Sequence, residues 1–180
     1  MRKKDFPVSE VRRFLEPGPT VLITSAYKDA RNVMTMNWHT VLEFSPSLVG
    51  LMIAGGNYTH GLLRKSKECV INIPQVDMID MVAKIGNCSG DDVDKFAAFD
   101  LKTAKASKVK APLLADCFAN FECKLDEYIA RYNFFIFRVV KAHVAAHPKY
   151  PKTMHYRGEG VFMTSGDNVS RARLFKPEML

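Results

Sequence analysis

The stretch that decides the fold runs from Val21-Leu22-Ile23-Thr24-Ser25-Ala26 through the turn Lys28-Asp29-Ala30-Arg31 and into a longer run from Val33 to Leu42. The first run is rich in β-formers and ends at turn residues, which predicts a strand. Side chains of the second run alternate between two faces, and this two-residue period also predicts a strand. One face holds Met34, Met36, Trp38, Thr40 and Leu42, and the other holds Val33, Thr35, Asn37, His39 and Val41.

Short apolar runs separated by turn residues continue along the chain. Further strands are predicted at residues 48–54, 69–73, 121–126, 134–144 and 158–164. Caps at Asn57-Tyr58-Thr59 and at Asp77, together with helical spacing, predict two short helices, the first running to about Lys67 and the second ending at Gly86. A short helical turn is expected at residues 95–99. Residues 102–115 are expected to form a loop. Because the strands do not alternate with long helices, we expect a mainly β, antiparallel barrel with short helices.

The composition is that of an ordinary globular protein. The 180 residues suit a single domain over residues 1–180, and 47% of them are hydrophobic. No apolar run approaches the roughly 20 residues that span a bilayer, and the charged start is not followed by a long apolar segment. We therefore expect a cytoplasmic protein without a membrane partner.

The formal net charge is +7, and the basic excess lies mainly in residues 100–180. Such a charge attracts nucleic acid or anionic ligands. The densest basic stretch, residues 102–110, has no interleaved aromatic residues and no nucleic-acid-binding motif. We interpret it as a solvated loop and expect no nucleic-acid partner; an anionic cofactor explains the positive bias equally well.

Residues that bind metals elsewhere do not form a recognisable metal site here. His143 and His147 are four apart, but Pro148 follows and no third ligand is evident nearby. The acidic residues at 91, 92 and 94 lack the spacing of an EF-hand and suit helix capping better. The cysteines fit no common zinc pattern and are expected to be free thiols: Cys69, Cys88, Cys117 and Cys123.

Three further clusters carry useful chemistry, at residues 32–38, 57–60 and 87–96. In this order they resemble the flavin reductase-like family, which includes flavoredoxin and consists of FMN-binding split-barrel proteins. The resemblance covers residues 18–145 and rests on an N-x-M-T motif, a Trp, a Y-T pair, an N-x-P motif and an S-G-x-x-x-D-K-F motif. The matching positions are Asn32, Met34, Thr35, Trp38, Tyr58, Thr59, Asn72, Pro74, Ser89, Gly90, Asp94, Lys95 and Phe96.

The resemblance implies an antiparallel split β-barrel that holds FMN. Backbone groups along Met34 to Trp38 would lie against the isoalloxazine ring and tune its potential. The phosphate would meet Thr59 at a helix N-terminus, with Lys95 supplying charge and Ser89 and Gly90 allowing close approach. No catalytic side chain is expected. The cofactor-binding set is Asn32, Met34, Thr35, Met36, Asn37, Trp38, Asn57, Tyr58, Thr59, His60, Ser89, Gly90, Lys95 and Phe96.

Each of these residues also has a structural interpretation. Thr59 could only cap a helix, Lys95 could be solvated, and Trp38 is more often a core residue than a cofactor contact. His60 could contact the phosphate or only occupy the first turn of a helix. The sequence departs from the family in lacking a glycine in the turn at residues 28–31, and Cys88 has no expected role.

Two functions remain open at this point. The first is an NAD(P)H-dependent flavin reductase, in which hydride passes from NADH or NADPH to FMN. The alternative is a flavoredoxin-like electron carrier that keeps FMN bound, does not oxidise NAD(P)H and exchanges electrons with a redox protein partner. The resemblance also implies a homodimer with FMN near the subunit interface.

Overall fold

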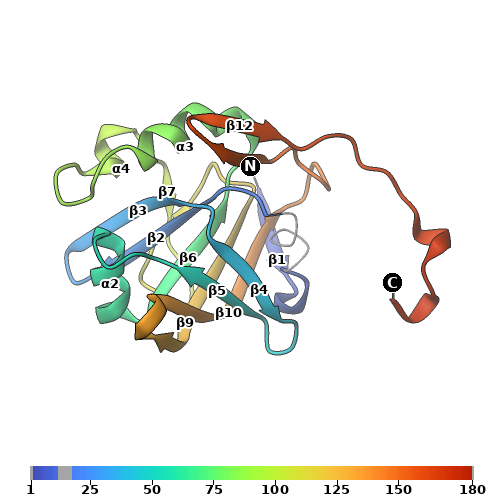
Figure 1. Ribbon diagram of the computed structural model, residues 1–180, viewed down its shortest axis with the longest axis horizontal. Helices are drawn as coiled ribbons and strands as arrows, with labels where there is room; N and C mark the ends of the chain where they lie inside the picture. Colours follow the sequence, from blue (N-terminus) through green and yellow to red (C-terminus); the bar gives the residue numbers. More distant parts are fainter. Residues whose placement is uncertain (1, 12–17, 180) are drawn as a thin grey trace.

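A computed structural model describes residues 2–11 and 18–179, and strands are its main regular elements (Figure 1). Every strand pair in it is antiparallel. The strands are β1 (Lys3–Phe6), β2 (Val21–Tyr27), β3 (Ala30–Met36), β4 (His39–Glu43), β5 (Leu48–Met52), β6 (Glu68–Ile73), β7 (Thr103–Ala104), β8 (Leu113–Leu114), β9 (Ala119–Ile129), β10 (Phe134–Ala145), β11 (Met154–Gly158) and β12 (Val161–Thr164). The prediction of a mainly β, antiparallel fold is confirmed.

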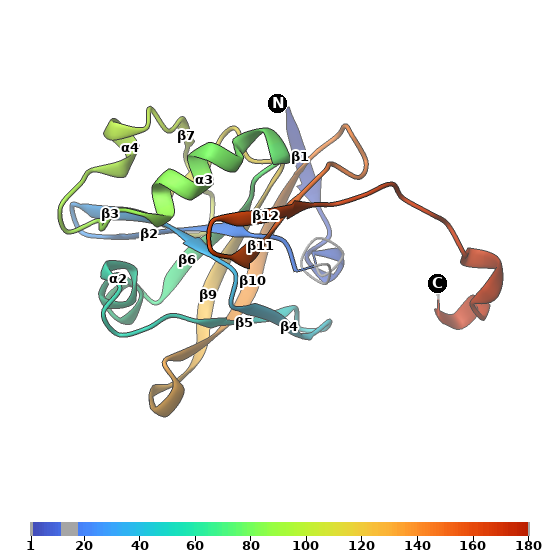
Figure 2. The same ribbon diagram turned by 45° about the horizontal axis from the view of Figure 1, so that its top comes forward.

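One curled sheet encloses the main core. Its strand order is β3-β2-β6-β9-β10-β5-β4, and β1 adds to β10. Helix α2 (Tyr58–Ser66) contributes buried Leu63 to this core. Helix α3 (Ile79–Gly86) covers the other face of β2 and β3, where Val82 and Ile85 pack with Leu22 and Val33 (Figure 2).

The barrel is split between β3 and β4. These strands are consecutive in the chain, yet they lie at opposite ends of the strand order. At Asn37 and Trp38 the chain leaves β2 and joins β5, so the prediction of one continuous strand from Val33 to Leu42 is wrong. Side-chain periodicity did not reveal this break, because the alternation of side chains continues where a chain changes its pairing partner.

Alternation holds within β3 itself. Met34 and Met36 pack against the main core, whereas Val33 belongs to the cluster under α3. The Thr35 hydroxyl donates a 2.7 Å hydrogen bond to the carbonyl of Val82 in α3. The two faces of β3 therefore touch the barrel interior and the outer helix, as the two-residue period predicts.

The helices lie close to their predicted positions, but two expected caps are wrong. The Asn57 side chain does not cap α2; its Nδ2 donates back to the Ala54 carbonyl at 3.3 Å. Asp77 lies in a 3₁₀ turn, η2 (Val76–Met78), and α3 starts only after it. In contrast, the carboxylate of Asp94 accepts from the N–H groups of Phe96 and Ala97 and caps α4 (Lys95–Ala98).

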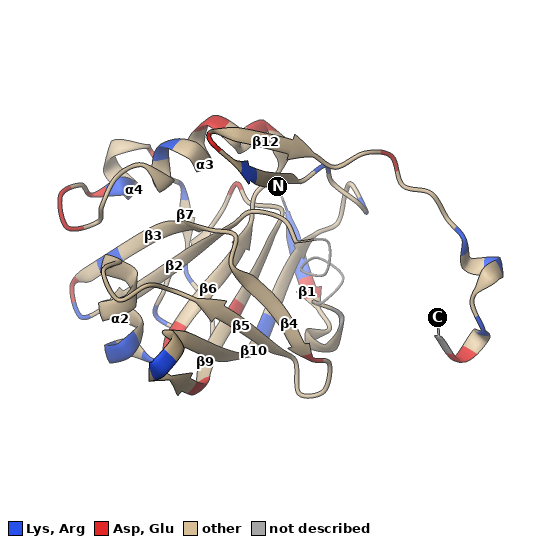
Figure 3. Ribbon diagram, in the orientation of Figure 1, with Lys and Arg blue, Asp and Glu red and all other residues tan. Residues whose placement is uncertain are grey.

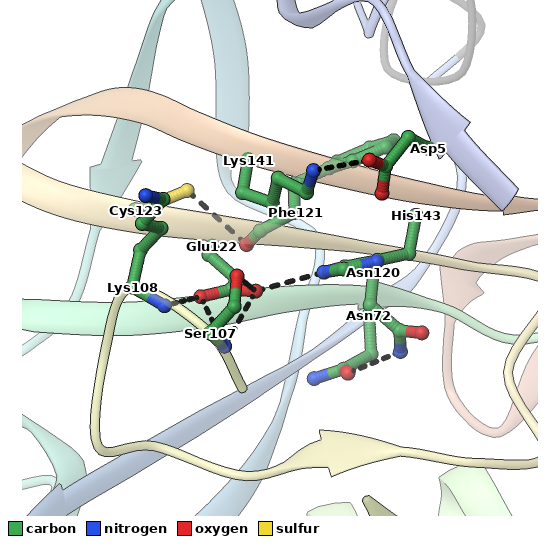
Figure 4. A network of polar contacts seen from close by, with 10 residues as sticks. All are labelled: Asp5, Asn72, Ser107, Lys108, Asn120, Phe121, Glu122, Cys123, Lys141 and His143. Atoms are coloured by element: carbon green, nitrogen blue, oxygen red, sulfur yellow. Dashed lines mark hydrogen bonds and ion pairs between the residues drawn. The ribbon is translucent and has the colours of Figure 1, made fainter. Parts of the chain in front are cut away.

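Residues 102–115 are more ordered than a loop, because they carry β7 and β8 and lie over β9. The alternation of Phe121 and Cys123 with Glu122 and Lys124 predicts a half-buried strand with Glu122 facing water, but Glu122 is fully buried beneath residues 102–115. Its carboxylate accepts hydrogen bonds from the backbone N–H groups of Ser107 and Lys108 and lies 2.8 Å from His143 Nε2 (Figure 4). Glu122, on the polar face of the alternating strand, thus faces the layer formed by residues 102–115 and not water.

The last predicted strand, at residues 158–164, covers β12 and the turn before it, which form a hairpin with a first strand, β11, that begins at Met154. None of the helices in the described ranges is long and apolar enough to cross a membrane. Within those ranges no three His, Cys, Asp or Glu side chains gather as a metal site would require, and His143 faces Glu122.

Candidate functional site

A cleft of about 540 Å³ opens at the split of the barrel. The segment that crosses the split, from Met34 to Trp38, forms one wall, and Trp38 is 68% exposed at the edge. This segment ends the β2 ladder and begins the β5 ladder, so its backbone is only partly committed to strand pairing. The other lining residues are Met52, Ala54, Asn57, Tyr156, Arg157 and Gly158. We call this the split cleft.

A second cavity, of about 430 Å³, adjoins the split cleft and shares Met34 and Asn57 with it. It lies between the start of α2, the end of α3 and the loop before α4. Its remaining lining residues are Asn32, Gly56, Tyr58, Thr59, Gly86, Asn87, Cys88, Ser89, Gly90 and Lys95. We call it the polar pocket. The two cavities together form one groove with an apolar, Met-rich end and a polar end.

Close packing sets the shape of the polar pocket at Gly90. A Cβ on Gly90 would collide with Asn32 Oδ1 and lie 2.6 Å from the ring of Tyr58. Only glycine lets the backbone approach this closely. Asn32 is itself fixed, because its Nδ2 donates a 2.8 Å hydrogen bond to the buried Thr59 hydroxyl. The pocket therefore brings together all three clusters that are far apart in sequence.

Lys95 is a buried cation in the polar pocket, only 4% exposed. Asp94 caps α4 and so fixes the backbone from which Lys95 projects. The Lys95 ammonium donates a 2.9 Å hydrogen bond to the Ile85 carbonyl near the C-terminus of α3. Burial lowers the pKa of Lys95, and the nearby Cys88 opposes this shift. An ammonium has three donors, so this one can hold α3 and still serve an anion in the pocket.

The sequence matches the model of the flavin reductase like domain over residues 12–163. The chain belongs to this family. A relative from Archaeoglobus fulgidus is 36% identical over 118 residues, which cover 66% of this chain and 66% of that protein. The match thus spans slightly under two thirds of the relative's length. The family resemblance predicted from the motifs is confirmed.

Solved structures share the fold of this flavin reductase-like chain. An FMN-binding domain of flavin reductases-like enzyme from Shewanella baltica superposes with a TM-score of 0.86 at 24% identity, covering 94% of this chain and 97% of that one. Flavoredoxin of Desulfovibrio vulgaris gives 0.79 at 20% identity over 86% and 90% of the chains. The NADH:FAD oxidoreductase SgcE6 of Streptomyces globisporus gives 0.72 at 18% identity over 83% and 87%. The split-barrel architecture is therefore confirmed.

Most of the expected site residues line the groove, but two do not. Phe96 is buried in the cluster under α3, where the guanidinium of Arg31 lies 4.3 Å from its ring centroid. His60 points to the far side of α2, and its Nε2 lies 3.0 Å from the hydroxyl of Tyr128. Burial lowers the pKa of His60, a hydrogen bond with Asn133 opposes that shift, and the Arg64 charge adds to it. Neither side chain lines the split cleft or the polar pocket.

The hairpin β11–β12 adds lining residues that sequence reasoning missed. Tyr156, Arg157 and Gly158 face the split cleft, and Arg157 Nη2 lies 3.0 Å from Met163 Sδ on the paired strand. The sequence held one usable signal, because Gly158 and Gly160 flank Glu159 and could have marked a tight turn after an earlier strand. Which cavity the hairpin borders depends on tertiary packing.

Proposed function

We propose that this chain binds FMN in the groove and acts as an NAD(P)H-dependent flavin reductase. The observation that carries the proposal is the arrangement of the groove, in which an apolar cleft at the split leads directly into a polar pocket with a buried lysine. FMN has the same arrangement, with a planar ring at one end and a phosphate at the other. Belonging to the flavin reductase like domain family supports the same assignment.

The residues on each side of the groove suit the two ends of FMN. Met34 and Trp38 offer apolar and aromatic surface to a planar ring, and the backbone between them carries N–H groups that can meet its pyrimidine edge. In the polar pocket, Lys95 and the N-terminal turn of α2 at Thr59 offer charge and N–H donors to a phosphate. Ser89 adds an exposed hydroxyl. The donor set therefore fits the cofactor.

Bound FMN would supply the two-electron chemistry, and the chain would supply position and environment. The walls of the split cleft would orient the ring and keep water from its inner face. Trp38 and the β11 hairpin border the cleft, where a nicotinamide could approach. No acidic or basic side chain is needed at the step itself, and the wall from Met34 to Trp38 carries none.

A flavoredoxin-like electron carrier is the second candidate, and the similarity to flavoredoxin of Desulfovibrio vulgaris favours it. The basic excess of residues 100–180 would then steer an acidic redox protein towards the chain. Both candidates need bound FMN and differ only in whether nicotinamides reduce it.

The visible spectrum of the purified protein distinguishes them. FMN is added in excess, unbound flavin is removed, and NADH or NADPH is then added without oxygen. We expect a bound flavin band that bleaches with nicotinamide. A band that bleaches with dithionite alone would identify the carrier. A protein that retains no flavin would contradict FMN binding altogether.

We also propose a homodimer. Leu42 lies in edge strand β4 and Trp38 lies directly before it, and these side chains are 42% and 68% exposed. The C-terminal residues 165–179 run away from the barrel on the side where β4 lies (Figures 1 and 2), and Leu174 there is 73% exposed. One chain thus carries two separate sets of exposed apolar side chains, which a second copy could bury in a two-fold arrangement.

A further inference from the structure

A separate cavity of about 380 Å³ lies between β1 and the connection after β10, which comprises residues 146–153 (Figure 2). Among the described residues, it has no lining residue in common with the split cleft or the polar pocket. Its lining residues are Lys4, Phe6, Val144, Ala145, Ala146, His147, Lys149 and Tyr150. We call it the β1 pocket. The proposed flavin chemistry makes no use of it.

The floor of the β1 pocket is apolar and continues the main core. Lys4 pairs with Val144 in the β1–β10 ladder, and residues directly opposite each other project from the same face of a sheet. Phe6, two residues further along β1, shares that face. Val144 belongs to the main core, and Phe6 packs against it. Val144 and Ala145 are each only 4% exposed, so a ligand here would lie on buried apolar surface.

Cationic side chains surround this apolar floor. The lining includes two exposed lysines, Lys4 from β1 and Lys149 from the connection after β10, together with the imidazole of His147. The described lining contains no acidic residue. A lysine can lay its aliphatic stem along an apolar floor and keep its ammonium in water at the mouth of a pocket. The mouth of the β1 pocket is therefore positively charged.

The acidic residue of β1 does not neutralise this charge. Figure 3 shows basic and acidic residues following one another along β1. Asp5 comes directly after Lys4 and so projects from the opposite face of the strand. There its carboxylate lies 2.7 Å from the ammonium of Lys141, and the hydrogen bond and charge of Lys141 lower the pKa of Asp5. The Asp5 carboxylate is thus paired on the far side of β1 from the pocket.

Aromatic rings contribute to two sides of the β1 pocket. Phe6 supplies one ring from β1, and Tyr150, which is 56% exposed, supplies the other from the connection after β10. The ammonium of Lys149 lies 5.2 Å from the centroid of the Tyr150 ring, so a cation and an aromatic surface are held side by side. A planar ligand can pack against such rings. The cavity is at the small end of ligand pockets, which measure roughly 300–1,000 Å³, and suits a single-ring ligand.

We propose that the β1 pocket binds a small aromatic carboxylate. The ring of the ligand packs on Phe6, Val144 and Tyr150. Its carboxylate lies at the mouth, beside the ammonium groups of Lys4 and Lys149. An apolar floor offers no hydrogen bonds to a strongly hydrated anion such as phosphate, and a neutral aromatic molecule makes no use of the two cations. The positive net charge of the chain favours the approach of such an anion.

Calorimetric titration of the full chain with cinnamate, cinnamamide and acetate tests the two halves of the site. Cinnamamide keeps the ring without the charge, and acetate keeps the charge without the ring. We expect cinnamate to bind at least about tenfold more tightly than either, because two ion pairs and one buried ring each contribute. Excess FMN should leave the Kd for cinnamate unchanged. Undetectable binding of cinnamate, or an affinity equal to that of cinnamamide or acetate, would overturn the proposal.

A charge-matched pair of variants locates the carboxylate. Lys149→Gln removes a cation that lines the β1 pocket, whereas Lys152→Gln removes an exposed cation, three residues further on, that does not line it. We expect Lys149→Gln to weaken cinnamate about threefold to fivefold, the value of one exposed ion pair, and to leave cinnamamide unchanged. Lys152→Gln should change neither. Equal effects of the two variants on cinnamate would contradict the assignment of the carboxylate to this mouth.

Two further variants separate the β1 pocket from the groove. Ala146→Phe adds a ring at an exposed lining position and should weaken cinnamate and cinnamamide at least about tenfold. If its Tm falls sharply, Lys4→Gln decides instead and should act as Lys149→Gln does. Arg157→Gln removes a cation from the split cleft and should leave cinnamate binding unchanged. Binding that is lost in Arg157→Gln and kept in the β1-pocket variants would place the ligand in the split cleft and overturn the proposal. These titrations do not require bound flavin, so they decide the β1 pocket even if FMN fails to bind.

Discussion

At the scale of the residue, Lys95 has two roles: it holds the end of α3, and it lines the pocket where the phosphate is expected. It is the only buried lysine within the described residues, and its ammonium is bonded to the end of α3 while it lines the polar pocket. The structural interpretation of a solvated Lys95 is therefore wrong. Its cofactor role stays a prediction that one substitution can test.

Lys95→Ala should weaken FMN binding by about 1.5–3 kcal/mol, the value of a hydrogen bond to a charged group. Riboflavin, which lacks the phosphate, should bind nearly as before. Quenching of Trp38 emission gives both affinities. Lys95→Met is the control for packing, because it retains much of the aliphatic chain and lacks the charge. An equal loss for FMN and riboflavin would show that Lys95 only supports α3.

Gly90→Ala should damage the polar pocket, because the new Cβ would collide with Asn32 Oδ1 and the Tyr58 ring. We expect a loss of about 1–3 kcal/mol in stability, as for other overpacked sites, together with weaker flavin binding. Urea denaturation and flavin titration measure the two effects. Gly166→Ala is the matched control, since a Cβ there would meet nothing within 4 Å. Indistinguishable results for the two variants would refute the close approach.

At the scale of the element, Glu122 attaches the segment with β7 and β8 to the barrel. Burial alone would raise the pKa of Glu122, but hydrogen bonds from His143, Ser107 and Lys108 outweigh burial and lower it. A carboxyl whose folded pKa is depressed stabilises the protein fully above its unfolded value. That contribution is lost as the pH falls from the ordinary value of 4.5 through the lower folded pKa.

Glu122→Gln should therefore cost about 1.5–3 kcal/mol at neutral pH, because several donors lose a charged acceptor. The difference from wild type should shrink below the ordinary pKa of a glutamate. Urea denaturation between pH 7 and pH 3 measures it. Asp126→Asn, on the same strand, removes the 2.7 Å exposed pair with Arg138 and should change stability by under about 1 kcal/mol. A cost for Glu122→Gln that is independent of pH would contradict the ionic role.

At the scale of the whole molecule, a second copy would bury the exposed residues beside β4. Leu42→Lys places a charge on that edge and should convert a dimer into a monomer in sedimentation velocity. Tyr132→Lys, at a position 59% exposed between β9 and β10, is the control and should remain dimeric. A wild type that sediments as a monomer at all concentrations would contradict the homodimer.

The sequence by itself determined several of the main elements. Alternation in β3 and β9, apolar content in β10, and helical spacing in α2 and α3 are local properties, so each could be recognised without the fold. The order of short motifs also determined the family, because Asn32, Thr59, Ser89 and Lys95 keep the spacing that the flavin reductase-like pattern requires. The polar pocket gathers those same residues.

Only the tertiary structure decided where the chain changes partners and what covers it. The break at Asn37 and Trp38 arises because β3 and β4 are the two edge strands of one sheet. The local alternation of side chains carries no information about this. Glu122 is buried because residues 102–115 lie over β9. His60 points away from the groove because its face of α2 packs against Tyr128. Burial and direction depend on neighbours that are distant in sequence, and folding alone brings those neighbours together.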